Sequence, residues 1–415
     1  RQGHQDPVLN AMYDRLSPIY RSFQPIIFTP KPLDQQAVVK GPDRPNVIVI
    51  MVESWRADVF DKGLMPRLEQ WSRQGLRLNN HYAGSYRSES GMFALLYGRS
   101  PIVYRPTLDA GIPPQLNETL RRSGYLTAYY SGHPKKWWWR EKFVNPQTFD
   151  RFVHNDKGSW PDWDRKALRQ MTKDVNQSDQ PMFALCFLMS SHLEYQYPPE
   201  HEHHTPVERS IRWTPTNMPA VGPEHREPLY NRYRNTMAFL DEEIHRAIRS
   251  LDPDRNIVIV MGDHGEAIGE NDHFGHYHMY GDISSRTPAV MVGPGLSPRR
   301  VDSPTVHQDL LPTLMHALNG QATPMKHVHG RDLFQEDEPR RSLLLVNYDQ
   351  KWTIKVRLVH EDLRLFMQLF DDESALEIVG LEDAHGQSVI NHGLKTADVD
   401  RWADLFEAEM TPFLN

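Results

Sequence analysis

A short apolar run at residues 256–261, Asn-Ile-Val-Ile-Val-Met, restricts the fold of this chain more than any other stretch. It is rich in β-branched residues and lacks an alternating polar face, which is typical of a strand buried in a parallel sheet. Asp263 and His264 follow almost directly. Open α/β sheets place their chemistry at the carboxyl ends of such strands, so a functional site is expected here. The alternative is a strand-to-loop turn with a capping Asp, which for an isolated Asp-His pair is the commoner case.

Two other apolar runs also end at polar side chains. Residues 46–52, Asn-Val-Ile-Val-Ile-Met-Val, lead into Glu53, and residues 182–189 lead towards His192. A carboxylate beside an imidazole suits Zn or Mn, because both accept oxygen and nitrogen ligands. Carboxylates and histidines that collect at strand ends have no structural need for one another, so the combined set favours a metal site over a capping turn.

The order of the predicted elements indicates the fold class. Further strands are predicted at residues 125–131 and 288–292, and helices at residues 65–75, 229–251 and 307–318. This alternation predicts an α/β fold with a mainly parallel central sheet that is sandwiched by helices.

Three segments divide the chain. Residues 1–45 are rich in Pro and polar residues and are predicted to be a linker or a strap from a membrane part. Residues 46–335 carry the strand–helix alternation and form the predicted catalytic domain. Residues 336–415 change to short strands with a final helix, which predicts a small C-terminal α+β subdomain.

A candidate nucleophile lies at the start of a predicted helix. Residues 88–97 are expected to be helical, and Gly98 can end that helix. Ser88 or Ser90 would lie at or near the N-cap, where a helix N-terminus and a nearby cation would favour an alkoxide. A plain Ser cap beside Glu89 is the alternative.

Two unusual loops have open interpretations. Residues 272–280 hold three histidines, among them His276 and His278, and form either a ligand set or a substrate-facing loop. Residues 135–143, Lys-Lys-Trp-Trp-Trp-Arg-Glu-Lys-Phe, form either a packed aromatic loop or a patch for lipid headgroups, since Trp with Lys and Arg favours the membrane interface.

Composition excludes several classes of protein. The 415-residue chain has a formal net charge of −7, so no global basic field favours nucleic acid. The single cysteine, Cys186, cannot form an intrachain disulfide. No stretch is apolar enough to span a bilayer, and there is no signal peptide. The chain begins at Arg1 rather than Met, so we expect a fragment from which a targeting or membrane part is missing.

Taken in order, these landmarks resemble the alkaline phosphatase and sulfatase superfamily. The resemblance runs from about Asn46 to Phe334 and includes Arg286-Thr-Pro288 and Asp309-Leu-Leu-Pro-Thr313. It is closest to membrane-anchored transferases of phosphoethanolamine and phosphoglycerol, to lipoteichoic acid synthases and to the related YejM/PbgA-type inner-membrane proteins. The segment 263–271 is similar to the phosphoethanolamine transferase motif. An alkaline phosphatase-like fold is therefore implied.

The resemblance also implies site residues. One divalent metal ion, Mn, Zn or Mg, would be held by four ligands, namely Glu53, Ser88, Asp263 and His264. Ser88 would be the nucleophile, with Ser90 as second choice. The residues that would contact the substrate are His192, His276, His278 and Arg286. Of these, His192 and His276 would also be catalytic, by stabilising the transferred phosphoryl group or protonating the leaving group.

The implied function is metal-dependent phosphotransfer from a phosphodiester, such as a phosphoethanolamine or phosphoglycerol headgroup, through a phosphoseryl intermediate. A formylglycine sulfatase is disfavoured, because Ser88 is followed by Glu89-Ser90-Gly91 rather than by Pro and then Arg. A hydrolase (phosphatase, phosphodiesterase or sulfatase) and a non-catalytic lipid-binding module that uses Trp137–Arg140 are the alternatives. The expected partners are a phospholipid or another lipid or glycan of the envelope, and no nucleic acid. The expected location is the periplasmic or extracellular face of the bacterial inner membrane.

Overall fold

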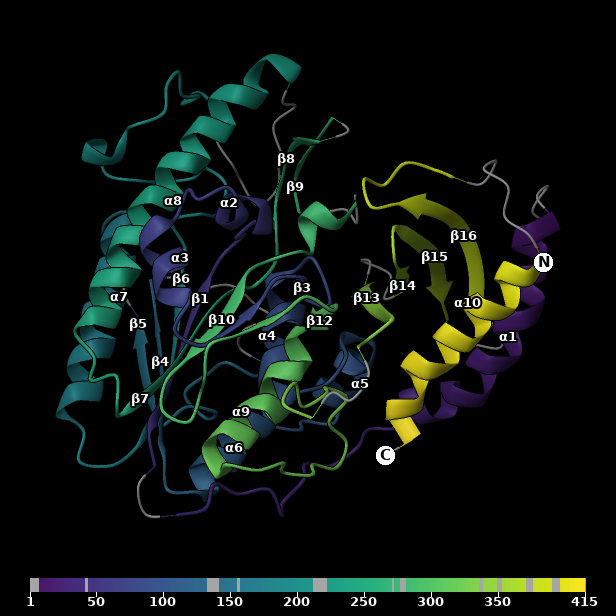
Figure 1. Ribbon diagram of the computed structural model, residues 1–415, viewed down its shortest axis with the longest axis horizontal. Helices are drawn as coiled ribbons and strands as arrows, with labels where there is room; N and C mark the ends of the chain where they lie inside the picture. Colours follow the sequence, from purple (N-terminus) through teal and green to yellow (C-terminus); the bar gives the residue numbers. More distant parts are fainter. Residues whose placement is uncertain are drawn as a thin grey trace.

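The computed structural model describes residues 7–41, 44–132, 142–154, 157–211, 222–270, 272–276, 281–335, 339–348, 353–370, 376–389 and 396–414. Within them, a large unit built on a mainly parallel sheet lies beside a smaller unit built on an antiparallel sheet (Figure 1). The α/β fold class predicted from the sequence is confirmed.

The large sheet contains eight strands of the described chain. In spatial order they are β11 (Arg299–Val301), β2 (Leu76–Leu78), β10 (Ala289–Val292), β7 (Asn256–Gly262), β1 (Asn46–Val52), β6 (Met182–Leu188), β4 (Leu126–Ser131) and β5 (Arg151–His154). The strands from β7 to β5 are parallel to their neighbours, whereas β10 is antiparallel to both β7 and β2. The parallel strands β1, β6 and β7 are the three apolar runs on which the sequence prediction rested.

Helices cover both faces of this sheet (Figure 1). Strand β1 is buried on both sides, because its side chains from Val47 to Met51 alternate between two hydrophobic clusters. One cluster includes residues of α4 (Ser88–Tyr97), α5 (Tyr104–Asp109), α6 (Gln115–Arg122) and α9 (Leu310–Asn319). The other includes residues of α2 (Ala57–Asp61), α3 (Pro66–Ser72), α7 (Trp160–Gln177) and α8 (Arg226–Arg249).

The smaller unit is an antiparallel meander that contacts the large unit. Its strands are β13 (Ser342–Tyr348), β14 (Ile354–His360), β15 (Leu363–Leu369) and β16 (Leu376–Asp383). Leu343, Leu345 and Val359 pack against Tyr82 and Val306 of the large unit. The two units therefore share a buried apolar contact.

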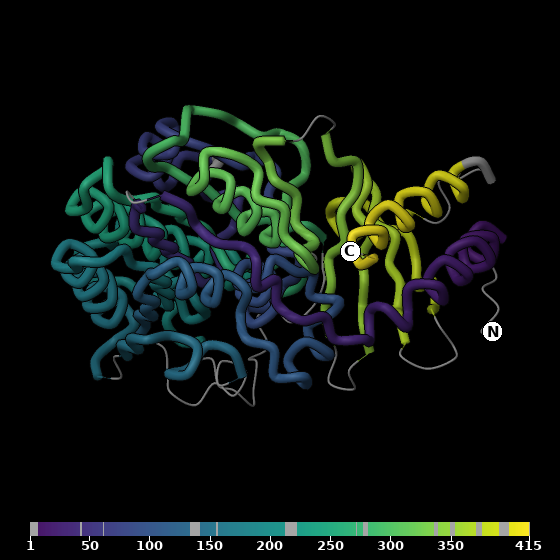
Figure 2. The backbone as a smooth tube through the Cα atoms, turned by 90° about the horizontal axis from the view of Figure 1, so that it is seen from below, coloured from purple at the N-terminus to yellow at the C-terminus, as the bar shows by residue number. Residues whose placement is uncertain are grey.

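The first and the last α-helix of the described chain lie side by side. Helix α1 (Pro7–Ile27) runs along α10 (Thr396–Met410) at the smaller unit (Figures 1 and 2). It buries one apolar face, including Leu16 and Tyr20, in the same cluster as Trp402. The predicted boundaries at residues 46 and 336 stay predictions.

After α1, the chain returns to the large unit. Arg99 donates to the carbonyls of Lys31 and Pro32, and the side chain of Gln115 bonds the backbone of Asp34. No helix among the described ranges combines the length and hydrophobicity needed to cross a membrane.

Candidate active site

The strand register brings several predicted site residues to one edge of the large sheet. Val52, the last residue of β1, pairs with Leu188 of β6 and with Gly262 of β7. The residues after these strands therefore emerge next to one another, as expected at the carboxyl edge of a parallel sheet. Glu53 comes directly after β1 and Asp263 directly after β7, and both side chains are fully buried.

Helix α4 brings Ser88 to this edge. A Cβ on Gly91, one turn into the helix, would lie 2.3 Å from the carbonyl oxygen of Asp263, so only glycine permits this close approach. Ser88 Oγ donates a hydrogen bond to Glu53 Oε2 at 3.1 Å and lies 3.2 Å from His264 Nε2. Ser88 therefore contacts both a predicted ligand carboxylate and a predicted ligand imidazole.

Asp263 has one oxygen engaged and one available. Its Oδ1 accepts hydrogen bonds from the backbone N–H groups of Ser54 at 2.8 Å and His264 at 2.7 Å. Its Oδ2 is buried and has no hydrogen-bond partner among the described residues, and it lies 3.5 Å from His264 Nε2. An unpartnered buried carboxylate oxygen is costly, and a bound cation would compensate for it.

Burial and like charge act together on Glu53. Desolvation, and then the neighbouring Asp263 carboxylate, raise the pKa of Glu53 well above its ordinary value. Two neighbouring buried carboxylates such as Glu53 and Asp263 repel each other unless a proton or a cation lies between them. The donor set therefore fits a divalent metal ion.

His264 is oriented as a ligand. Its Nδ1 lies 2.7 Å from the carbonyl oxygen of Gly265, so Nδ1 carries the proton and Nε2 keeps its lone pair. Nε2 lies 3.4 Å from Glu53 Oε1. Burial lowers the pKa of His264, which favours the neutral imidazole that metals require.

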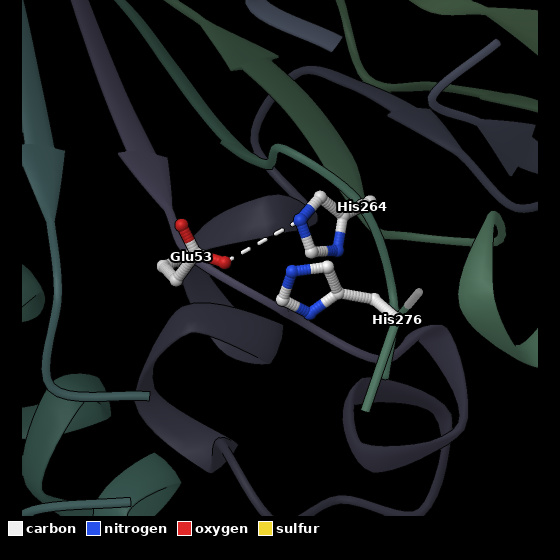
Figure 3. A group of neighbouring side chains, drawn as sticks. All are labelled: Glu53, His264 and His276. Atoms are coloured by element: carbon white, nitrogen blue, oxygen red, sulfur yellow. Dashed lines mark ion pairs between the residues drawn. The ribbon is translucent and has the colours of Figure 1, made fainter. Parts of the chain in front are cut away.

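His276 joins this cluster. One ligand atom each from Glu53, His264 and His276 all lie within 4.8 Å of one another, and the three side chains converge on a common space (Figure 3). The sequence prediction counted His276 among the catalytic and substrate-binding residues rather than the ligands. The structure makes it a candidate ligand as well, and the metal could be held by Glu53, Asp263, His264 and His276 together with Ser88.

His192 lies at the rim of the cluster. Its ring centroid is 5.9 Å from that of His276 and 5.4 Å from that of Trp160, at the start of α7. Its Nδ1 lies 2.7 Å from the carbonyl oxygen of Leu193. Burial, followed by the nearby His276, lowers the pKa of His192 to about 4, and burial lowers that of His276 to about 4 as well. Both rings are neutral at pH 7.

The remaining predicted residues are placed less directly. Arg286 donates from Nη2 to the carbonyl oxygen of Asn79 at 3.2 Å, and its own carbonyl accepts from the backbone of Ala57. Its contact with substrate stays a prediction. Ser90 is buried on α4. His278 and the Trp137–Arg140 patch lie outside the described residues.

Sequence reasoning gave no role to two groups that border the site. One is a pair of buried histidines: His81 Nε2 lies 2.8 Å from His307 Nδ1, and the pairing of β3 (His81–Tyr82) with β12 (Thr305–Val306) brings the two segments together. Burial lowers the pKa of His307 to about 4. The other group is centred on Glu266. Both depend on contacts between distant segments, which no local sequence pattern predicts.

Comparison with known proteins agrees with this fold and site. An ulvan-active sulfatase from Formosa agariphila is 23% identical over 352 residues, which cover 74% of this chain and 68% of that protein. Inner membrane protein YejM from Salmonella typhimurium is 24% identical over 311 residues, covering 71% of this chain and 45% of YejM. The chain therefore matches less than half the length of YejM.

Solved structures share the fold. A phosphonate monoester hydrolase from Agrobacterium radiobacter has a TM-score of 0.68 at 16% identity, over 89% of this chain and 96% of that one. The lipoteichoic acid synthase LtaP from Listeria monocytogenes has a TM-score of 0.61 at 16% identity, over 94% and 96%.

The fold and the site thus define an enzyme of the alkaline phosphatase and sulfatase superfamily, whose members depend on metal ions. Within it, residues 45–320 match the sulfatase family, and the chain belongs to that family.

Proposed function

We propose that this protein is a metal-dependent phosphotransferase that acts on a phosphodiester of the cell envelope, such as a phosphoethanolamine or phosphoglycerol headgroup. The observation that carries the proposal is the position of Ser88 Oγ, between Glu53 Oε2 at 3.1 Å and His264 Nε2 at 3.2 Å. A serine hydroxyl with these neighbours is placed to act as a nucleophile. The absence of Pro and Arg after Ser88 argues against conversion of this residue to formylglycine.

In the first half-reaction, a bond forms between Ser88 Oγ and phosphorus while the bond from phosphorus to the leaving oxygen breaks. The electron pair of that bond goes to the leaving oxygen, which becomes an alcohol when it takes up the proton lost by Ser88. His192 is neutral at pH 7 and so can accept and pass on this proton, and His276 can do so if it is not a ligand of the metal. An acceptor alcohol then attacks phosphorus and releases Ser88 with its proton restored.

A divalent metal ion, Mn, Zn or Mg, held by Glu53, Asp263, His264 and Ser88 would lower the pKa of the Ser88 hydroxyl and neutralise the phosphoryl oxygens. The buried, unpartnered Asp263 Oδ2 and the raised pKa of Glu53 support this ligand set. His276 is the further ligand candidate.

A hydrolase that uses the same site with water as acceptor is the second candidate, and the similarity to an ulvan-active sulfatase favours it. The two are distinguished by incubating the protein with a phosphodiester donor alone and with an added alcohol. A transferase accumulates phosphorylated Ser88 or requires the alcohol for turnover, whereas a hydrolase turns over in water alone.

The similarity to YejM supports an envelope location, at the periplasmic or extracellular face of the inner membrane. The proposed partners are a phospholipid or another lipid or glycan of the envelope, and the membrane that carries it. Cell fractionation of the full-length protein tests this location, and recovery of the full-length protein in the cytosolic fraction would contradict it.

The central experiment measures metal content by elemental analysis in the wild type and in Asp263→Asn, together with release from a chromogenic phosphodiester and from an aryl sulfate. Asn retains the oxygen that accepts from Ser54 and His264, so the fold should persist. We expect near-stoichiometric metal in the wild type, little in the variant, and phosphodiester cleavage that depends on the metal. Sulfate release in place of phosphodiester cleavage would show that the protein acts as a sulfatase.

A further inference from the structure

Glu266 is a fully buried carboxylate that side chains from three separate loops reach. Its Oε2 accepts from His276 Nδ1 at 2.7 Å and from Ser54 Oγ at 3.1 Å, and its Oε1 accepts from Tyr195 OH at 3.0 Å. Ser54 lies after β1 and Tyr195 after β6, whereas His276 lies after β9 (His273–Gly275). One carboxylate thus joins the loops after two central strands to the loop that holds a candidate ligand.

The backbone around this carboxylate is strained. Ser54 has φ +53° and Tyr195 has φ +55°, which is the left-handed region that non-glycine residues rarely adopt. Such conformations persist only where the surroundings impose them, and they gather at functional sites. Both of these residues place their side-chain hydroxyl within hydrogen-bond distance of Glu266, so both conformations occur around this carboxylate.

The bond between Glu266 and His276 determines which nitrogen of the His276 ring carries the proton. Because Nδ1 donates to Glu266, the proton lies on Nδ1 and the lone pair lies on Nε2. Figure 3 shows the two nitrogens on different sides of the ring, with one directed towards Glu53 and His264. The ring centroids of His276 and His264 are 4.3 Å apart, and a ring nitrogen of His276 lies within 4.8 Å of the ligand atoms of Glu53 and His264.

Ser54 connects Glu266 to the ligand carboxylate itself. Its Oγ lies 2.9 Å from Glu53 Oε1 as well as 3.1 Å from Glu266 Oε2. The hydroxyl therefore bridges the two buried carboxylates. Glu266 therefore contacts the candidate ligand His276 directly and is linked to the candidate ligand Glu53 through the Ser54 hydroxyl.

We propose that Glu266 is a positioning residue, which holds His276 in the tautomer and ring orientation that direct its Nε2 lone pair at the metal site. The role of His276 Nε2 as a metal ligand rests on the proposed function, whereas the tautomer of the ring does not. Partners that orient a ligand in this way commonly matter for metal affinity about 10- to 100-fold.

The test combines two measurements on the same variants. The first is the tautomer of the His276 ring in the metal-free protein, read from nitrogen-15 chemical shifts of histidine-labelled samples, with the His276 signals assigned by their loss in His276→Gln. The second is the dissociation constant for Mn²⁺ or Zn²⁺ by calorimetry. Glu266→Ala removes the acceptor, whereas Glu266→Gln keeps an oxygen for His276 and an amide that can donate to Tyr195.

We expect Glu266→Ala to lose the Nδ1–H tautomer and on the order of 10- to 100-fold in metal affinity, and Glu266→Gln to retain the tautomer and most of the affinity. Glu270→Ala is the matched control, because Glu270 ends β8 (Ala267–Glu270), the strand that directly follows Glu266, but pairs with Arg56 at 2.8 Å. If Glu266→Ala does not fold, Glu266→Asp withdraws the carboxylate from His276 while keeping the charge.

A wild-type tautomer together with wild-type metal affinity in folded Glu266→Ala or Glu266→Asp would overturn the proposal. Failure of the proposed function gives a different result, because a wild-type protein that transfers no phosphoryl group can still show a tautomer that depends on Glu266. The same loss of affinity in Glu270→Ala would also overturn the proposal, since it would reflect general loosening of the antiparallel pair β8 and β9 rather than loss of the contact between Glu266 and His276.

Discussion

At the scale of single residues, the site is a set of buried polar atoms. Among them, Asp263 Oδ2 has no hydrogen-bond partner in the described residues, and a bound cation would supply one. Glu53 and Asp263 are both fully buried carboxylates, and each reaches His264 Nε2 within 3.5 Å. Two buried carboxylates are unfavourable without compensation, and no arginine or lysine pairs with either of them among the described residues. Their arrangement fits a divalent metal ion.

The first prediction concerns the nucleophile. Ser88→Ala should lower turnover of a phosphodiester by about 10³-fold or more, because it removes the attacking oxygen. Its thermal unfolding temperature should stay close to that of the wild type, since the hydroxyl is small and its partners are site residues. Ser90→Ala is the control, and loss of turnover in that variant alone would assign the nucleophile to Ser90.

At the scale of elements, the strands and helices position the site and are held to each other by polar contacts as well as by apolar packing. Gly91 allows α4 to touch the loop after β7, and β3 pairs with β12 beneath it. At the other end of α4, Ser100 N donates to His329 Nδ1 at 3.1 Å, and the His329 ring packs on Phe413 with centroids 4.2 Å apart. A neutral imidazole is required for this contact.

The second prediction derives from that contact. Burial, with a smaller effect from Arg99, lowers the pKa of His329 to about 3, against 6.5 for the unperturbed residue. Between pH 3 and pH 6.5, the His329 ring of the unfolded chain therefore binds a proton that the ring of the folded chain does not. The contribution of the neutral ring to the free energy of unfolding is complete above pH 6.5 and is lost as the pH falls. At pH 5 the loss is about 2 kcal/mol.

His329→Gln removes this titration but keeps an oxygen that can accept from Ser100. Urea unfolding at pH 7.5 and pH 5 should show a smaller difference between the two conditions in the variant than in the wild type. The exposed His385→Gln serves as control, and an unchanged pH dependence in His329→Gln would refute the assignment.

At the scale of the whole molecule, the two sheet units depend on each other. Besides the shared apolar contact, a buried ion pair joins them: Arg340, just before β13, donates from Nη1 and Nη2 to the two carboxylate oxygens of Asp309 at 3.0 and 2.9 Å. Asp309 ends the 3₁₀ turn η6 (His307–Asp309), which also carries His307 of the buried histidine pair. The smaller unit is thus tied to the segment that supports the site.

The third prediction tests this coupling. Arg340→Met should lower the free energy of unfolding by about 3–5 kcal/mol, because it leaves the buried Asp309 carboxylate without its counter-charge. Arg401→Met, which breaks the exposed pair with Glu361, should cost no more than about 1 kcal/mol. Chemical denaturation of both variants gives the comparison, and equal effects would show that the buried pair has no special importance.

The sequence by itself determined the central strands and the polar residues that follow them. Apolar runs such as residues 46–52 and 256–261 can be satisfied only as strands covered on both faces, and parallel strands present the residues after their carboxyl ends at one edge of the sheet. Glu53, Asp263 and His264 therefore lie together at that edge. Ser88 lies at the start of a helix, and only the family resemblance implied its place beside them. This information is local, because strand periodicity and the residues at strand ends are properties of short stretches.

Only the tertiary structure decided the contacts between segments far apart in the chain. Glu266 receives Tyr195, Ser54 and His276 from three loops, and α1 buries its apolar face beside α10 at the opposite end of the sequence. The physical reason is that periodicity shows that a face must be buried, or that a carboxylate needs partners, but not which segment supplies them. That choice depends on the packing of the whole chain.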